Sequence, residues 1–199
     1  MSQEIKSSNV DVVGKPVFIR IFKQEDIFEL WVANGAKFEL YKTYKICAWS
    51  GNLGPKLKEG DGQSPEGFYS VAKSQLKPDS SYHRAFNLGF PNEYDKAHGR
   101  TGSFLMVHGN CVSIGCYAMT DPIIEEIYYL VEAALSNGQK AFQVHIFPFK
   151  MTEENLEKYK SNKWIKYWWN LKEGHDLFEK NKVPPAVGLN NKNYIFREL

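Results

Sequence analysis

Apolar and polar residues alternate along the first third of the chain, and this pattern predicts three short β-strands. The strands are expected in PVFIRIF (16–22), IFELWVANG (27–35) and AKFELYKTYKICAWSG (36–51). The pair Asn34-Gly35 lies between two alternating runs, which is typical of a two-residue hairpin turn. A further strand is expected in FYSVAKSQL (68–76), another in SFLMVHG (103–109), and another in AFQVHIFPF (141–149).

The clearest helix is expected from Asp121. Asp121 can cap it, Pro122 suits its first turn, and Gly138 would end it after Asn137. Apolar residues recur within it at helical spacing, namely Ile123, Ile124, Ile127, Leu130, Val131 and Leu135. A short charged helix should open at Thr152, and another is expected in residues 162–182, before an extended tail with a final strand. The pattern predicts an α+β domain on a mixed, mainly antiparallel sheet.

Two segments are predicted to be long loops because they are rich in glycine, proline and polar residues. They are SGNLGPKLKEGDGQSPEG (50–67) and NLGFPNEYDKAHGRTG (87–102). Long ordered loops are often functional. The acidic residues of the first loop, Glu59, Asp61 and Glu66, could suggest a metal cluster, but without histidine among them they are interpreted as solvated turn carboxylates, and no metal or other cofactor is expected.

Composition narrows the class of protein. The chain has 199 residues, 43% hydrophobic and 24% charged, with a formal net charge of +2. No basic stripe indicates nucleic-acid binding, and no apolar run is long enough to span a bilayer. The first residues lack the apolar segment of a signal peptide, so the chain is expected to be cytosolic or to have lost a leader. Three cysteines do not predict a disulfide framework or a zinc site.

The segment GSFLMVHGNCVSIGCYAM (102–119) carries the candidate chemistry. His108 stands eight residues before Cys116, at the expected end of a strand. A thiol nucleophile needs a base, and its acyl transfer needs donors for an oxyanion. We therefore predict a cysteine acyl-transfer enzyme with Cys116 as nucleophile and His108 as base. The helix that starts near Asp121 is expected to favour the thiolate, whereas Cys47 and Cys111 are interpreted as inert core or loop residues.

Other residues are assigned supporting roles. Ser113 could orient His108 through its hydroxyl or its backbone carbonyl, or be a turn residue, and the backbone N–H groups of Gly115 and Cys116 are the natural oxyanion donors. Arg100 could bind a substrate carboxylate through its planar guanidinium, or be a surface arginine. His145 could reach the same pocket from a neighbouring strand, or be a satisfied structural histidine. The tryptophans Trp164, Trp168 and Trp169 could form a sugar platform, although their helical spacing favours packing against the sheet.

VHGNCVSIGCYAM resembles the catalytic motif of the L,D-transpeptidases, the YkuD-like family, in which a His-Gly pair precedes Ser/Thr-x-Gly-Cys. GDGQSPEGFYSV and the later VHIFPF also resemble this family, and the second loop with the site strand is most similar to its YafK-like branch. The resemblance covers residues 16–150, with 1–15 as an N-terminal extension and 151–199 as a helical, aromatic-rich C-terminal extension packed on the same domain.

The resemblance implies a β-sandwich-like catalytic domain that acts on peptidoglycan stem peptides. Cys116 would attack the L-centre carbonyl of meso-diaminopimelate and form a thioester, with Ser113, Gly115 and Gly109 completing the motif, and Tyr117 beside it as a substrate contact. An amine or water would then resolve the thioester. The wall lies outside the cytoplasmic membrane, so the resemblance implies a periplasmic protein whose leader has been removed.

The sequence departs from the family pattern in two places. Ile114 stands where a second histidine is common, and Ala118 stands where an arginine usually follows the cysteine. The site is therefore expected to bind the donor differently, with Arg100 as a replacement for the missing arginine. Some members of this branch are thought to hydrolyse, releasing a wall-linked lipoprotein.

Three functions remain open. They are a transpeptidase, a hydrolase of the same bond type (a lipoprotein-releasing amidase or an L,D-carboxypeptidase), and a wall-binding module without turnover. A papain-like protease fits poorly, because its cysteine precedes its histidine.

Overall fold

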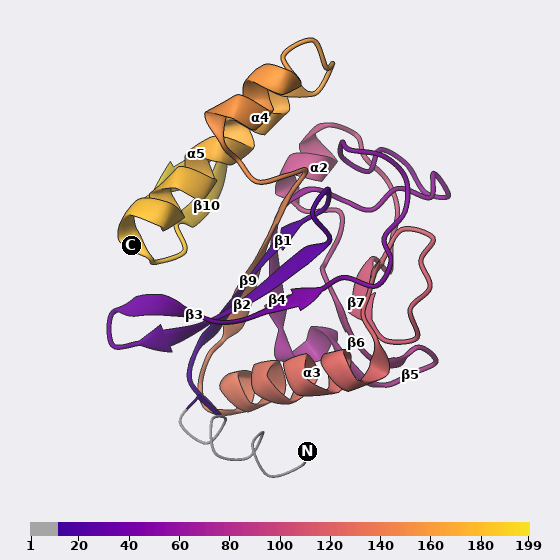
Figure 1. Ribbon diagram of the computed structural model, residues 1–199, viewed down its shortest axis with the longest axis vertical. Coiled ribbons are helices and arrows are strands. Elements are labelled where there is room, and N and C mark those ends of the chain that lie inside the picture. The colour runs from indigo at the N-terminus through magenta and orange to yellow at the C-terminus, as the bar shows by residue number, and fades with distance from the viewer. Residues whose placement is uncertain (1–11) are drawn as a thin grey trace.

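The computed structural model describes residues 12–199, in which a five-stranded sheet is the main scaffold (Figure 1). Its strand order is β3-β2-β1-β9-β4. The only parallel pairing within it is that of β1 with β9, and its other neighbours are antiparallel. The predicted α+β class with a mixed, mainly antiparallel sheet is confirmed. The strands are β1 (Val17–Phe22), β2 (Ile27–Asn34), β3 (Lys37–Lys45), β4 (Gly67–Ala72) and β9 (Ala141–Phe147).

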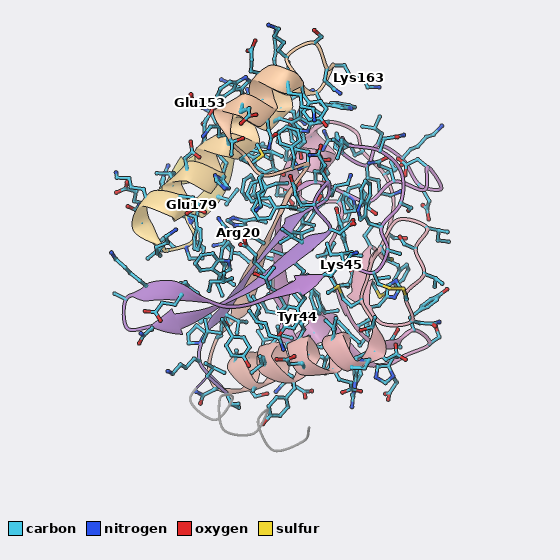
Figure 2. The ribbon with its side chains drawn as sticks, viewed as in Figure 1. Arg20, Tyr44, Lys45, Glu153, Lys163 and Glu179 are labelled. Atoms are coloured by element: carbon cyan, nitrogen blue, oxygen red, sulfur yellow. A yellow bond between two sulfur atoms is a disulfide. The ribbon has the colours of Figure 1, made fainter. Side chains whose placement is uncertain are left out.

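Both faces of this sheet are covered by helices, and strand β1 shows why. Side chains alternate across a strand. Val17, Ile19 and Ile21 belong to the core shared with helix α3 (Asp121–Ser136). Arg20, from the opposite face, reaches Glu179 on helix α5 (Ile165–Asn181) at 2.5 Å (Figure 2). The sheet is therefore a central layer with α3 on one side and the C-terminal helices on the other (Figure 1).

A second, four-stranded sheet carries the candidate site. It comprises β5 (Leu76–Ser80), β6 (His83–Asn87), β7 (Met106–His108) and β8 (Tyr117–Ala118). Strands β7 and β8 are parallel neighbours, with Val107 opposite Tyr117 and His108 opposite Ala118. An antiparallel bridge from Ala48 to Ala118 ties β8 to the segment after β3. The predicted strand over 103–109 is thus shorter than expected but does end at His108.

The predicted helix starts and stops are largely confirmed. Helix α3 has Thr120 as its N-cap, Asp121 as its first residue and Asn137 as its C-cap. The Thr152 hydroxyl accepts a hydrogen bond from the Asn155 N–H and caps α4 (Glu153–Lys158). The tail forms the hairpin β10 (Ala186–Asn190) and β11 (Asn193–Arg197), and β4 leads through the 3-10 turn η1 (Lys73–Gln75) into β5.

One short helix, α2 (Glu93–Ala97), lies inside the second predicted loop. Its N-terminus is closed by a capping box, in which Asn92 and Asp95 bond each other's backbone N–H groups. None of the helices within residues 12–199 is long and apolar enough to cross a membrane. The first eleven residues of the predicted N-terminal extension lie outside the described part of the chain.

Cys47 and Cys111 lie in connecting segments, as expected, but the sequence did not predict that they form a disulfide, with Cα atoms 5.3 Å apart. The backbone brings them together: the Cys47 N–H bonds the Ala118 carbonyl, and the Cys111 N–H bonds the Met119 carbonyl. The disulfide therefore fastens the segment between His108 and Cys116 to the segment that follows β3. Cys116 is the remaining free cysteine.

Candidate active site

His108 and Cys116 line one cavity of about 480 Å³. Strand geometry explains why. Parallel pairing of Val107 with Tyr117 places Cys116 beside Met106, and side chains two residues apart on a strand share a face. The Met106 N–H accordingly donates to Cys116 Sγ at 3.4 Å. The eight-residue spacing in the sequence thus puts the candidate nucleophile and the candidate base on the same side of adjacent strands.

The His108 ring has a fixed orientation. Its Nδ1 lies 2.6 Å from the Gly109 carbonyl oxygen, which can only accept, so Nδ1 carries the proton of the neutral ring and Nε2 is left as the basic nitrogen. Gly109 has no room for a side chain, because a Cβ there would lie 2.6 Å from Asp121 Oδ1. The Tyr82 ring lies 4.9 Å from the imidazole, centroid to centroid.

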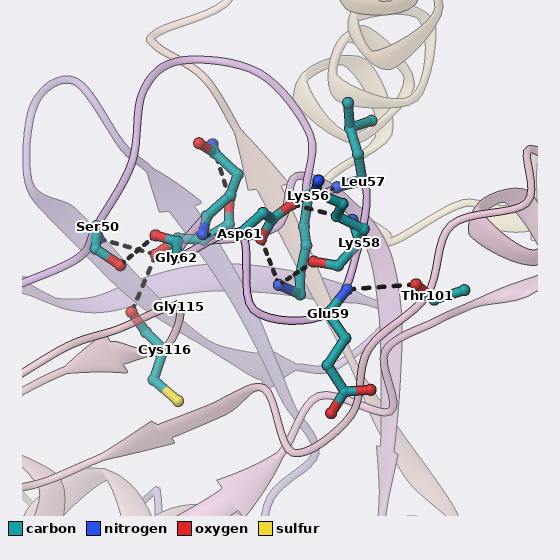
Figure 3. A network of polar contacts seen from close by, with 12 residues as sticks. Ser50, Lys56, Leu57, Lys58, Glu59, Asp61, Gly62, Thr101, Gly115 and Cys116 are labelled. Carbon is teal, nitrogen blue, oxygen red and sulfur yellow. Dashed lines mark hydrogen bonds and ion pairs between the residues drawn. The ribbon is translucent and has the colours of Figure 1, made fainter.

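Two serine hydroxyls hold the Cys116 backbone. Ser113 Oγ and Ser64 Oγ donate to the Cys116 carbonyl at 2.7 and 3.1 Å. In Figure 3 the Cys116 carbonyl points toward the loop 50–66, which supplies Ser64, and the Cys116 thiol points away from that loop. The prediction that Ser113 orients His108 was wrong, since the Gly109 carbonyl does this.

Gly115 also differs from its expected role. Its N–H donates to Ser113 Oγ at 3.2 Å, so this donor is engaged within the loop. Its φ of +133° is a conformation that other residues rarely adopt. Gly115 therefore shapes the turn that leads into Cys116.

The resting thiol and imidazole are both shifted toward their neutral forms. Burial raises the pKa of the Cys116 thiol, although the Met106 N–H and the charge of Lys56 oppose this. Burial likewise lowers the pKa of His108, opposed by its bond to the Gly109 carbonyl. Burial therefore sets the net direction of the shift at the resting thiol, and a contribution of the α3 dipole toward the thiolate stays a prediction. The arrangement suits proton transfer from thiol to imidazole during attack.

The three residues assigned to substrate binding do not line this cavity. Arg100 is buried and forms an ion pair with Asp95 at 2.7 Å. The Tyr117 side chain is fully buried, and its hydroxyl donates to the Pro65 carbonyl at 2.7 Å. His145 is also fully buried, 2.8 Å from the Gln143 side-chain oxygen. The structure therefore does not bring these side chains to the candidate pair; the burial of His145 agrees with its alternative interpretation as a structural histidine, whereas Arg100 is neither in the cavity nor at the surface.

Three residues that were not predicted line the cavity in place of Arg100, Tyr117 and His145. Lys56, Tyr82 and Phe104 line the cavity with the candidate catalytic pair. Phe104 is 68% exposed and has a φ of +54°, a strained conformation that is frequent at functional sites. Lys56 was within a loop predicted to be functional, but no local pattern distinguishes it from Lys58. Tyr82 lies in a polar stretch without any signal.

The loop 50–66 is held by a buried ion pair. Lys23 Nζ lies 3.2 Å from Glu66 Oε1, and both side chains are fully buried. Trp168 Nε1 on α5 donates to the other Glu66 oxygen at 2.9 Å. The interpretation of Glu66 as a solvated carboxylate was wrong, whereas the packing interpretation of Trp168 is confirmed by its burial. The loop that supplies Ser64 is thereby fixed to the core.

Within residues 12–199 no group of three or more His, Cys, Asp or Glu side chains could hold a metal ion.

Comparison with known proteins agrees with this architecture. The profile of the YkuD L,D-transpeptidase catalytic domain matches residues 16–146. The Escherichia coli (strain K12) protein named "Putative L,D-transpeptidase YafK" is 50% identical over 195 residues, covering 98% of this chain and 78% of that protein. The same values hold for the protein of that name in strain O157:H7.

Two solved structures of the helical cell shape determining protein Pgp2 from Campylobacter jejuni share the fold. One, of a point mutant, aligns with a TM-score of 0.56 at 21% identity, covering 88% of this chain and 61% of that one. The other aligns with a TM-score of 0.54 at 18% identity, covering 90% of this chain and 76% of that one. The profile match and the identity to YafK show that this chain belongs to the YkuD family of L,D-transpeptidases.

Proposed function

We propose that this protein is a peptidoglycan-modifying, cysteine-dependent acyl-transfer enzyme. Its substrate would be the stem peptide, and Cys116 would attack the L-centre carbonyl of a meso-diaminopimelate residue. The observation that carries the proposal is that His108 and Cys116 line one cavity with His108 Nε2 left as the basic nitrogen. Family membership and the relation to YafK supply the substrate class.

The first half-reaction follows from these positions. His108 Nε2 takes the thiol proton as Cys116 Sγ forms a bond to the carbonyl carbon. The C–N bond of the donor amide then breaks, and the imidazolium returns the proton to the leaving amine. The products are a thioester at Cys116 and a free amine, such as D-alanine.

In the second half-reaction an acceptor amine or water attacks the thioester. His108 removes the proton of the attacking group, and the thiol is regenerated as the new amide or acid leaves. Transpeptidation and hydrolysis differ only in the attacking group, so the same residues serve both reactions.

The exposed apolar rim of the cavity favours hydrolysis of a wall-linked protein as a second candidate. Tyr82, Phe104, Val112 and Ile114 line the cavity and are 44%, 68%, 51% and 89% exposed. Stem peptides and water offer little apolar surface to such a rim, whereas the polypeptide of a linked lipoprotein does.

The disulfide between Cys47 and Cys111 supports a location in an oxidising compartment, such as the periplasm. A wall-modifying enzyme needs access to that compartment. The periplasmic assignment therefore stands as part of the proposal.

The experiment is a muropeptide digest of purified sacculi that carry bound lipoprotein. Wild type and Cys116→Ala are incubated with the sacculi, and the products are analysed by mass spectrometry. New diaminopimelate–diaminopimelate bonds or exchanged D-amino acids identify a transpeptidase. Loss of lipoprotein remnants or terminal D-alanine without new bonds identifies a hydrolase. Equal products from wild type and Cys116→Ala would refute the cysteine mechanism.

A further inference from the structure

Lys56 is a buried cation in the wall of the catalytic cavity. The residue is only 4% exposed, yet it lines the same cavity as His108 and Cys116. The only other charged side chain of that lining, apart from His108, is Glu59. Burying an ammonium group costs free energy unless the group is paired. Lys56 therefore depends on hydrogen-bond acceptors in the surrounding loop.

The loop orients Lys56 through two hydrogen bonds. Its Nζ donates to the Lys58 carbonyl at 2.9 Å and to Asp61 Oδ1 at 2.5 Å (Figure 3). Gly102 gives the lysine stem its space, because a Cβ there would lie 2.8 Å from Lys56 Cε. The ammonium group is thus fixed in the cavity wall.

Asp61 is the ion-pair partner of Lys56, with Nζ and Oδ1 2.5 Å apart. Its carboxylate also accepts hydrogen bonds from the backbone N–H groups of Leu57, Lys58 and Gln63. Its pKa is lowered to about 2, because the bonds from Lys56 and from these backbone groups outweigh the effect of burial. Asp61 is therefore ionised at neutral pH, with its oxygens shared among four donors.

Lys23 provides an internal comparison. Its Nζ is fully buried and has four acceptors, the carbonyls of Asn52, Gly54 and Ser64 and the Glu66 carboxylate. These exceed the three N–H donors of an ammonium group, so Lys23 is saturated and structural. Among residues 12–199, Lys56 Nζ has two such acceptors, and the residue lines a cavity, which leaves one N–H donor for a ligand.

We propose that Lys56 binds the D-centre carboxylate of the donor diaminopimelate, at the far end of the residue whose L-centre carbonyl Cys116 attacks. This proposal rests on the proposed function, and it names Lys56 as the residue that recognises the donor stem peptide. In meso-diaminopimelate the D-centre carries the matching carboxylate, whereas a lysine residue or an amidated diaminopimelate lacks it. Lys56 takes the role expected of Arg100, whose guanidinium is bound to Asp95 outside the cavity.

The test measures binding without turnover, in the Cys116→Ala background. Two stem tetrapeptides are titrated calorimetrically, one with free diaminopimelate and one with its D-centre carboxamide. The free carboxylate is expected to bind at least about tenfold more tightly, and Lys56→Met is expected to reduce this ratio to about one. Lys58→Met, the same change at an exposed lysine two residues away, is the matched control and should leave the ratio unchanged.

Asp61→Asn guards against a purely structural effect. It removes the same ion pair but keeps the ammonium, so the preference for the carboxylate should survive. The proposal would be overturned by any of three results for the ratio of affinities between the free and the amidated tetrapeptide. The ratio could be near one with Lys56 present, it could be unchanged in Lys56→Met, or it could fall to about one in Asp61→Asn.

The outcome is separable from that of the proposed function. If the wild type fails to process any stem peptide while the binding ratio depends on Lys56, the carboxylate site stands and the proposed function fails. If wild-type turnover depends on Cys116 but the ratio is independent of Lys56, the proposed function stands and this inference fails.

Discussion

His108 Nδ1 donates a hydrogen bond to the carbonyl oxygen of Gly109, the next residue in the chain, at 2.6 Å. The ring is therefore oriented by its own backbone, and no carboxylate in the described part of the chain pairs with it to stabilise an imidazolium. Because burial also lowers the pKa of His108, the neutral base is favoured before the substrate arrives.

The hydrogen bond and burial of His108 predict how kcat/KM depends on pH. The apparent pKa of the acid limb of that profile should lie below the ordinary imidazole pKa of about 6.5. Protonation of His108 removes the base, and the lowered pKa moves that loss to lower pH. The rate of D-alanine release from a stem tetrapeptide, followed from pH 4 to 9, measures it. An acid limb above about 7 would mean that the imidazolium is stabilised and would contradict this assignment.

The Cys116 thiol should titrate above its ordinary pKa of about 8.5, because burial outweighs the opposing Met106 N–H and Lys56 charge. The pH dependence of alkylation by iodoacetamide reports this value. Lys56→Met should raise it further, since the opposing cation is lost, whereas Lys58→Met should not. Half-maximal alkylation below about pH 7 would instead indicate a preformed thiolate–imidazolium pair.

Ser113→Ala should lower kcat/KM about tenfold while costing only about 1 kcal/mol of unfolding free energy. The hydroxyl holds the Cys116 carbonyl, and a small displacement of a nucleophile is costly for rate. Steady-state kinetics and urea unfolding separate the two effects. Ser74→Ala, at an exposed serine, is the control; equal rates in both variants would show that Ser113 does not position the nucleophile.

Removal of the disulfide in Cys47→Ala/Cys111→Ala should cost about 4 kcal/mol of unfolding free energy, given the 64-residue separation of the cysteines. Activity should fall as well, since the bond fastens the segment between His108 and Cys116. Urea unfolding with and without reductant measures this, and the double variant should no longer respond to reductant. A loss below about 1 kcal/mol would contradict a stabilising role.

The sequence predicted those parts of the fold and site that depend on neighbouring residues. The period of the apolar residues predicted α3, and the spacing of His108 and Cys116 predicted their shared cavity. The Asn34-Gly35 pair predicted the β2–β3 hairpin, although its two-residue turn lies one position later, at Gly35-Ala36, because Asn34 pairs with Lys37. Local propensity and strand alternation suffice for each of these.

The missed features depend on partners far away in the chain. Glu66 is buried because Lys23, 43 residues earlier, neutralises it, and Cys47 bonds a cysteine 64 residues later. Arg100 appeared free for substrate, but Asp95 on the short helix α2 binds it. A single sequence does not reveal such pairings before the chain is folded.

The most direct test of the cysteine mechanism is acid-quenched mass spectrometry of the enzyme during turnover of a stem tetrapeptide. If Cys116 is the nucleophile, wild type carries the tripeptide acyl group on Cys116 and releases D-alanine, whereas Cys116→Ala shows neither while remaining folded. D-alanine release by Cys116→Ala, or an acyl group on any other residue, would contradict this role of Cys116.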